Sequence, residues 1–194
     1  MRKTVRRLGC FFSSSSWVFK VWFRNLTSTV HVSKGERLGL GTSIAFDIGF
    51  VVDGYCSDFG RSLYFGLASA EVKKGYEALQ QSVVETADKM KPGNAQVCDL
   101  FPALEKTLDR LGYGDYLRAR LPTKNLGHSI GVEVHEPPWL SPDYDEELQS
   151  GMVIALEPKL WHKGEYYLRV EDMVLIGSRK AEFLTNFDRE LFRL

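Results

Sequence analysis

Cysteine is scarce in this chain of 194 residues, which has three copies, Cys10, Cys56 and Cys98. Their odd number excludes a fully paired disulfide framework, and no Cys-x-x-Cys spacing occurs that would suit a structural zinc site. Both absences favour a reducing compartment, and we expect a cytoplasmic protein.

Long apolar runs and an excess of charge of either sign are also absent. No stretch of about 18 consecutive apolar residues exists, which excludes a typical membrane-spanning helix. The formal net charge at pH 7 is zero, so the composition predicts neither a nucleic-acid partner nor a membrane partner. A hydrophobic content of 44% and a charged content of 26% are typical of one globular domain.

Acidic residues are missing before Glu36, where every charged side chain is basic and a run of serines occupies Ser13–Ser16. An arginine- and serine-rich, acid-poor start is typical of an organelle-targeting presequence. We favour the alternative, a divergent and poorly ordered N-terminal segment. The chain then divides into residues 1–35 and a folded domain at residues 36–194.

The most distinctive stretch of this domain is a predicted β-hairpin. Asp53-Gly54 separates two strand-like segments, Ser43–Val52 and Tyr55–Phe65. The dipeptide suits a type I′ turn, because both central residues of such a turn need positive φ.

Each arm of the hairpin carries a carboxylate where a buried strand seldom has a charge. Asp47 stands between Phe46 and Ile48, and Asp58 lies on the opposite arm. A buried carboxylate is costly unless it is paired or bound to a metal, and two facing carboxylates also repel each other. A cation between them would remove both costs.

Two helices are predicted after the hairpin. Ser69 is a candidate N-cap of the first helix, which we expect to end near Met90. Asn94 is a candidate N-cap of the second helix, whose apolar residues recur every three or four positions as far as Leu111. Gly112 suits the position that ends a helix in the left-handed conformation.

Short strands and loops rich in glycine, proline and histidine follow the helices. The apolar run Met152–Leu156 predicts one strand, and Tyr166–Ile176 predicts another. His128 lies at the start of this region, Glu157 follows the first run, and Glu171 interrupts the second.

Five side chains in or beside these strand-like segments have the chemistry of metal ligands. Four carboxylates and one imidazole form a hard, oxygen-rich set that suits Mn²⁺, Fe²⁺, Co²⁺ or Zn²⁺ better than a thiolate site would. Each alone is more often a salt-bridge partner or a structural histidine, so the prediction depends on the joint pattern. The set is Asp47, Asp58, His128, Glu157 and Glu171.

In order and spacing, these residues resemble the pita-bread metallopeptidases (family M24), which include methionine aminopeptidases, Xaa-Pro aminopeptidases, prolidases and creatinases. The resemblance covers about residues 36–194 and implies that they form a catalytic domain of α+β class, with a curved antiparallel sheet covered by helices. The matching segments are Asp47–Gly49, Gly54–Arg61, Gly127–Gly131, His135–Pro137, Gly151–Pro158 and Arg169–Asp172.

The resemblance implies a dinuclear metal centre in which Asp58 and Glu171 bridge two divalent ions. Asp47 would complete the ligands of one ion, and His128 and Glu157 those of the other. A hydroxide held between the ions would be the nucleophile that attacks a peptide bond. Mn²⁺ is the favoured ion, with Zn²⁺, Co²⁺ and Fe²⁺ as alternatives.

Further roles are implied for residues around these ligands. Glu157 would also shuttle a proton, and His135 would face the substrate and stabilise the developing oxyanion. A loop histidine without a catalytic role is the alternative for His135. Arg169 would bind the substrate or pair with Asp47, and Arg61 would have a structural or a catalytic role.

The Arg169–Asp172 stretch is similar to the Xaa-Pro aminopeptidase and prolidase branch, and the complete ligand set argues against a creatinase, which replaces metal ligands. The chain departs from the family pattern before Asp47, because the 46 residues there are too few for the usual first layer of the fold. We therefore expect a fold that is incomplete at the N-terminus. A family histidine of that region has only His31 as a candidate.

The leading hypothesis is a metal-dependent hydrolase of peptide bonds, an Xaa-Pro aminopeptidase or dipeptidase with a peptide substrate. One alternative is a hydrolase of small-molecule amides or amidines with the same fold. Another is a truncated pita-bread module without catalytic activity. A homodimer is an open prediction for the assembly.

Overall fold

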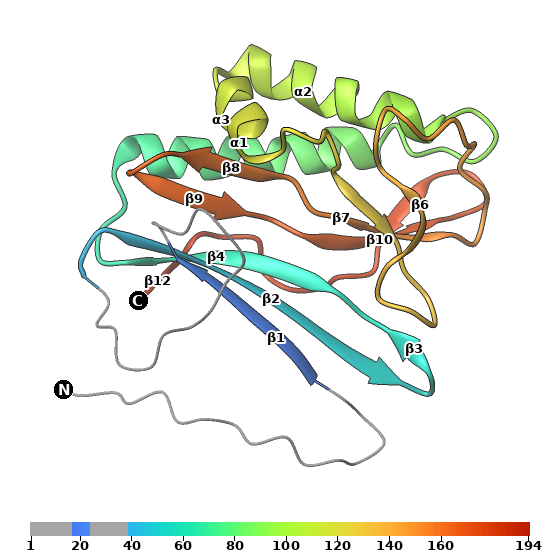
Figure 1. Ribbon diagram of the computed structural model, residues 1–194, viewed down its shortest axis with the longest axis horizontal. Coiled ribbons are helices and arrows are strands. Elements are labelled where there is room, and N and C mark those ends of the chain that lie inside the picture. Colours follow the sequence, from blue (N-terminus) through green and yellow to red (C-terminus); the bar gives the residue numbers. More distant parts are fainter. Residues whose placement is uncertain (1–16, 24–38) are drawn as a thin grey trace.

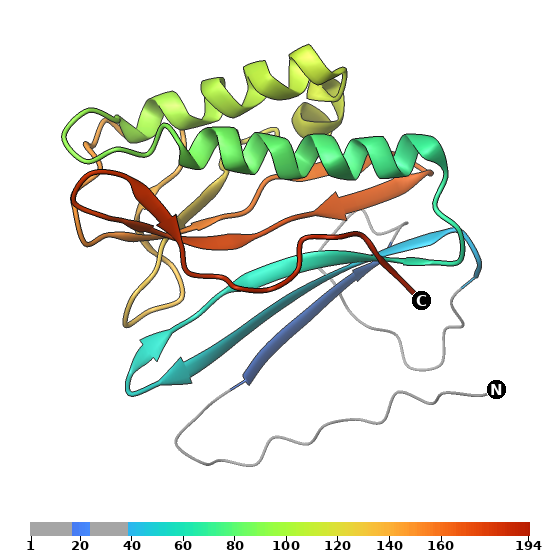
Figure 2. The same cartoon turned by 180° about the vertical axis from the view of Figure 1, so that it is seen from behind.

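Helices cover one side of the strands in the computed structural model of the protein (Figure 1). The structure describes residues 17–23, by their backbone alone, and residues 39–194. The helical layer consists of α1 (Ala70–Ala87), α2 (Leu100–Leu111) and α3 (Gly114–Arg120). Seen from behind, α1 lies between α2 and the strands (Figure 2).

The first sheet contains the predicted hairpin. Its strand order is β1-β2-β4-β12, and β3 pairs with β2. β12 runs parallel to β4, whereas the other pairs are antiparallel. The strands are β1 (Trp17–Phe23), β2 (Thr42–Val52), β3 (Tyr55–Cys56), β4 (Phe59–Phe65) and β12 (Phe192–Arg193).

The remaining strands form an antiparallel second sheet, with the order β11-β10-β7-β5-β6, and a separate β8–β9 hairpin. The expected α+β class is confirmed, and the described strands form three hydrogen-bonded sheets. The strands are β5 (Gly127–Ser129), β6 (Glu136–Trp139), β7 (Val153–Leu156), β8 (Lys159–His162), β9 (Tyr166–Arg169), β10 (Asp172–Ile176) and β11 (Ala181–Phe183).

The β2–β3 turn has the predicted conformation, with φ of 52° at Asp53 and 85° at Gly54. The second arm, however, is not one strand over Tyr55–Phe65. It is interrupted at Asp58, whose backbone amide does not pair with β2. This amide instead donates a hydrogen bond to the sulfur of Met173 (3.4 Å).

The strand predicted at Tyr166–Ile176 is also interrupted. β9 ends at Arg169 and β10 begins at Asp172. Between them, the Glu171 amide donates to the Gly60 carbonyl (2.9 Å), and the Gly60 amide donates to the Glu171 carbonyl (3.2 Å). The backbone of Glu171 thus pairs with β4 of the first sheet and not with a strand of the second sheet.

Ser69 caps α1 as predicted, because its hydroxyl oxygen accepts a hydrogen bond from the Val72 amide (3.2 Å). The helix ends at Ala87 and not near Met90. The Met90 amide bonds the Ala87 carbonyl three residues back, which tightens the chain beyond the helix and places the Met90 side chain in the core.

The predicted start of the second helix is wrong, because Asn94 does not cap it. A 3₁₀ turn, η1 (Val97–Asp99), precedes α2, and its first amide donates to the carbonyl of Glu146 in a distant loop (2.8 Å). Gly112 ends α2 with φ of 86°, as predicted. α3 was not predicted from the sequence.

Apolar side chains of the helices and strands meet in one core. Leu79 of α1 and Leu104 of α2 are fully buried, as are Ile154 of β7 and Leu168 of β9. Each such side chain stabilises the fold by roughly 1.5–3 kcal/mol relative to an exposed one. The helical spacing of apolar residues in the sequence therefore predicts the face that α2 buries.

β1 lies inside the predicted N-terminal segment, where the sequence analysis places no strand. The other residues of that segment, and with them Cys10 and His31, lie outside the described residues. The division at residue 35 and the incomplete N-terminus therefore stay predictions. Within residues 39–194, no helix combines the length and the apolar character needed to cross a membrane.

Arg61 connects both sheets to the C-terminal segment. Its fully buried guanidinium forms an ion pair with Asp172 (2.6 Å) and donates to the backbone carbonyls of Glu171 (2.6 Å) and Asp188 (2.9 Å). Arg189 bonds the other carboxylate oxygen of Asp172 (2.7 Å). Of the two roles expected for Arg61, these contacts support the structural one.

We expect Arg61→Leu to destabilise the fold by about 3–5 kcal/mol, because Asp172 would lose its fully buried partner. Urea unfolding followed by circular dichroism measures the change. Arg110→Leu is the matched control, since it removes an exposed ion pair with Glu85 that is worth at most about 1 kcal/mol. Equal losses in the two variants would contradict the role of Arg61.

Candidate metal centre

The five predicted metal ligands, distant in the sequence, come together in one cluster, which we call the ligand cluster. Three sets of side chains have potential ligand atoms within 4.8 Å of one another, and Asp58, His128 and Glu171 each belong to two of them. The sets are Asp47 with Asp58 and Glu171, His128 with Glu157 and Glu171, and Asp58 with His128 and His135.

Three of the four carboxylates of the ligand cluster lie at breaks between strands. Asp58 lies between β3 and β4, Glu157 between β7 and β8, and Glu171 between β9 and β10, whereas Asp47 lies within β2. Side chains within a strand must alternate between two faces, but a side chain at a break is free of that alternation. The three carboxylates can therefore turn toward a common point.

Gly60 allows β4 to approach the ligand cluster. It is opposite Asp47 in the β2–β4 register. A Cβ atom at this position would lie 2.8 Å from Glu171 Oε2 and 2.9 Å from Arg169 Nε, closer than side chains tolerate. The close contact between these segments therefore requires glycine at position 60.

Arg169 lies among the carboxylates and balances part of their charge. One guanidinium nitrogen donates to Asp47 (2.8 Å), and a second donates to both Glu157 (2.7 Å) and Glu171 (2.6 Å). Arg169 is only 2% exposed. The contact with Asp47 agrees with the expected pairing, while substrate binding by Arg169 stays a prediction.

Two carboxyls of the cluster have pKa values far above the ordinary range. Burial, followed by the charge of Glu171 and a hydrogen bond with Asp47, raises the pKa of Asp58 to about 9. Burial also raises the pKa of Glu171 to about 8, against the opposing charge of Arg169. Without a cation, burial and the repulsion among the carboxylates therefore favour the protonated forms of Asp58 and Glu171.

Glu157 has the opposite behaviour. Burial alone would raise its pKa, but the positive charges of Lys159 and Arg169 outweigh burial and lower the pKa to about 2. Glu157 is therefore ionised at neutral pH, which makes it the permanent anion of the ligand cluster.

His128 presents a neutral ring to the carboxylates. Burial is the largest cause of its lowered pKa. Its Nδ1 atom lies 3.0 Å from the Ser129 carbonyl, and its Nε2 atom lies 3.9 Å from an Asp58 carboxylate oxygen. The neutral imidazole, with one nitrogen held by the backbone, is the form in which histidine binds metals.

One buried atom of the cluster points directly to a cation. Glu171 Oε1 is buried and has no hydrogen-bond partner within the part of the chain that the structure describes. An unsatisfied buried oxygen is costly, and here three more carboxylates and an imidazole surround it. A hard divalent cation would satisfy this oxygen, so the residues fit the predicted metal centre.

His135 lies at the exposed side of the ligand cluster. Its ring centroid is 4.5 Å from that of His128 and 6.0 Å from that of Trp139, and the ring is nearly parallel to the indole, at 17°. His135 is therefore an exposed imidazole beside a predicted ligand, and its contact with substrate stays a prediction. The sequence analysis missed Trp139, for which a position four residues after His135 is the only signal.

Lys159 was missed as well. Its ammonium contacts Glu157 Oε2, the oxygen that also accepts a hydrogen bond from Arg169. Its position two residues after a predicted ligand, in the segment Glu157-Pro158-Lys159, is the signal that could have identified it.

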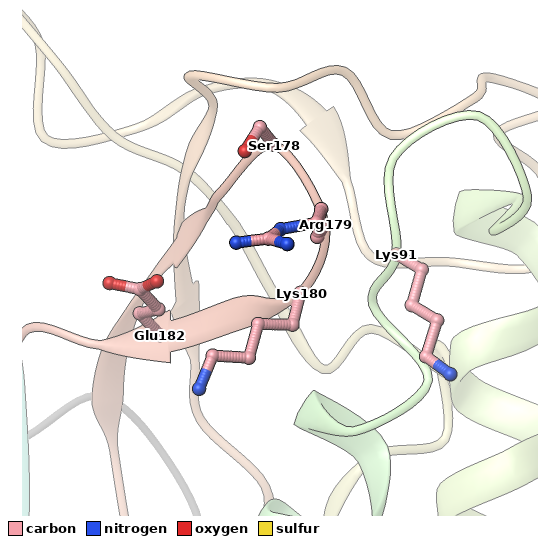
Figure 3. Close-up of a pocket in the computed structure, with 5 residues that line it drawn as sticks. All are labelled: Lys91, Ser178, Arg179, Lys180 and Glu182. Carbon is pink, nitrogen blue, oxygen red and sulfur yellow. The ribbon is translucent and has the colours of Figure 1, made fainter.

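A surface pocket elsewhere contains none of these residues. Figure 3 shows Lys91 on one side of this pocket and the turn between β10 and β11 on the other. Three basic side chains and one carboxylate surround it. The lining residues are Lys91, Ser178, Arg179, Lys180 and Glu182.

The chain is similar to known proteins over most of its length. The model of metallopeptidase family M24 matches residues 2–178. The chain belongs to metallopeptidase family M24. An uncharacterized peptidase of Staphylococcus epidermidis is 31% identical to this M24 chain over 170 residues, which cover 87% of the chain and 47% of that relative.

Solved structures confirm the pita-bread fold of this M24 chain. A prolidase from Thermococcus sibiricus has a TM-score of 0.78 at 31% identity, covering 92% of this chain and 47% of that one. An Xaa-Pro dipeptidase from Bacillus anthracis has a TM-score of 0.80 at 27% identity, covering 93% and 49%. The M24 chain thus spans about half the length of the curated relatives it matches.

Titration of the metal-depleted protein with Mn²⁺ at pH 7 should release protons. The carboxyls of Asp58 and Glu171 are protonated below their raised pKa values, and a cation displaces those protons. The release should fade as the pH rises past about 9. Calorimetry in buffers of different ionisation enthalpy measures it.

Asp58→Asn should reduce the number of protons released. Identical heats in all buffers at pH 7 would contradict the raised pKa values.

Proposed function

We propose that the chain is a metal-dependent hydrolase of peptide bonds, of the Xaa-Pro dipeptidase or aminopeptidase type. The observation that carries this proposal is the convergence of three other carboxylates and a neutral histidine around the unsatisfied Glu171 oxygen. The prolidase and the Xaa-Pro dipeptidase among the similar structures support the substrate class.

We assign the ligand cluster two divalent cations. Asp47, Asp58 and Glu171 would hold one, and His128, Glu157 and Glu171 the other, with Asp58 within reach of His128. Mn²⁺ is our first choice, and Zn²⁺, Co²⁺ and Fe²⁺ suit the same donors. Such a pair of cations supplies an activated water near neutral pH and polarises the scissile carbonyl.

The chain's own residues would move the proton and stabilise the developing charge. Glu157 would accept the proton of the attacking water and pass it to the leaving amine. Lys159 and Arg169, which hold its pKa low, keep it in the ionised form from which this step would start. His135, exposed beside His128, would face the substrate and donate to the developing oxyanion.

Two alternatives keep the same site. A hydrolase of small-molecule amides would bind the cations but leave Xaa-Pro peptides intact. A non-catalytic module would bind no cations and would cleave no Xaa-Pro peptide. The buried and complete set of five candidate ligands favours an enzyme, because a binding module gains nothing from four adjacent buried carboxylates. Metal analysis together with an assay on Xaa-Pro dipeptides separates the three.

Asp58→Ala should lower kcat/KM for an Xaa-Pro dipeptide by more than about 100-fold. Even the mutation of a residue that only supports a metal ligand often lowers metal affinity or activity by roughly 10–100-fold. Its metal content, measured by mass spectrometry, should fall with it. Asp145→Ala, at an exposed position in a loop, is the matched control. Full activity in Asp58→Ala would refute the proposed centre.

His135→Ala should lower kcat by about 10²–10³-fold, the usual cost of removing one oxyanion donor, while metal content stays at the wild-type level. His162→Ala is the control, since His162 pairs with Glu71 away from the ligand cluster. A loss of bound metal in His135→Ala would assign His135 to the ligands instead.

A further inference from the structure

Trp139 borders the ligand cluster but has no role in the proposed function. It is the last residue of β6, it is half-buried, and its backbone pairs with that of His128 in β5. Its ring centroid lies 6.0 Å from that of His135, with 17° between the ring planes, and 5.8 Å from that of His128, with 62° between them. The indole thus packs against both a predicted metal ligand and the predicted oxyanion donor.

A β-bulge brings His135 and Trp139 together. The register between β5 and β6 shifts after His128, which places Pro137–Pro138 in the bulge. Residues four positions apart in a regular strand are separated by about 13 Å, whereas the two ring centroids are 6.0 Å apart. Because a bulge changes the direction of the strand and of its side chains, this one accounts for the stacking of the two rings.

The orientation of His135 depends on these ring contacts. His135 lies in the exposed loop just before β6. A functional histidine is usually oriented by a hydrogen bond to the nitrogen that it does not use. Within residues 39–194, no hydrogen bond holds the His135 ring, and the rings of Trp139 and His128 pack against it instead. Stacking also leaves both imidazole nitrogens open to a substrate.

The backbone around Trp139 is firmly held. The Trp139 carbonyl accepts a hydrogen bond from the Ser141 amide (2.7 Å). The next residue, Leu140, is fully buried, and its amide donates to the Gly127 carbonyl (2.9 Å). Trp139 therefore presents a fixed aromatic surface to the exposed imidazole of His135.

We propose that Trp139 is a positioning residue of the reaction, which holds the His135 imidazole where it can donate to the developing oxyanion. This inference rests on the proposed peptidase function and on the role assigned there to His135. Without the indole, the imidazole would spend time in other orientations, and the fraction of molecules ready to react would fall. The stacking energy of one aromatic pair sets this loss at about three- to tenfold.

The first experiment measures kcat and KM for Ala-Pro on the Mn²⁺-loaded full chain. Trp139→Leu should lower kcat by about three- to tenfold, with KM changed by less than about twofold and metal content at the wild-type level. Trp139→Phe should recover most of kcat, because a phenyl ring can stack in the same place. A higher KM with unchanged kcat would overturn the proposal, since Trp139 would then be a substrate contact.

A double-mutant cycle separates positioning from a general loss of structure. If Trp139 acts through His135, Trp139→Leu should change kcat by less than about twofold in the His135→Ala background. Independent, multiplying losses would refute the proposal. Tyr116→Leu is the matched control and should keep the wild-type kcat, because half-buried Tyr116 stacks on His162, away from the ligand cluster, at 19° and 4.7 Å.

NMR spectroscopy of the chain loaded with diamagnetic Zn²⁺ provides a readout that does not depend on turnover. The ring protons of His135, assigned by their absence in His135→Ala, should be shifted upfield by the indole. Trp139→Leu should move these signals downfield, and Tyr116→Leu should leave them in place. If wild type shows the upfield shift but cleaves no peptide, the peptidase function fails while the orienting contact stands. Unchanged His135 signals in Trp139→Leu would refute the contact.

Discussion

Repulsion among four carboxylates around one buried point is the constraint on which the rest of the structure depends. At close range and low dielectric, like charges repel strongly, and burial adds its own cost. Arg169 offsets part of this by bonding Asp47, Glu157 and Glu171 at once. The remaining repulsion must be relieved by protons or by cations. A fold that brings these carboxylates together is therefore suited to metal binding.

The basic side chains do not offset the charge of the four carboxylates equally. This difference gives neighbouring carboxylates of the ligand cluster two different chemical roles. Glu157 receives both basic side chains and stays ionised, while Asp58 and Glu171 keep their protons until a cation replaces them. One end of the site is thus a permanent anion, and the other responds to metal. Lys159 and Arg169 together create this difference, because both contact Glu157.

The sequence could predict what depends on local signals. The Asp53-Gly54 turn and the Ser69 cap need only their neighbours, and both were found. The clustering of the five candidate ligands could be predicted because the residues match the motifs of a known family in order and spacing. The interruption of the strand at Glu171 could not be predicted, since it depends on pairing with the distant Gly60. The contact of Lys159 with Glu157 could not be predicted either, since it depends on how two strand ends meet.

The ligand cluster draws on strand breaks and strands from both large sheets, so a cation bound there would connect the two sheets directly. By mass action, any ligand that binds only the folded chain raises its stability, by about 2.7 kcal/mol when its free concentration is 100 times its dissociation constant. The stability of this domain is then a joint property of the chain and the surrounding metal concentration. Unfolding measurements on its variants would be comparable only at a fixed free-metal level.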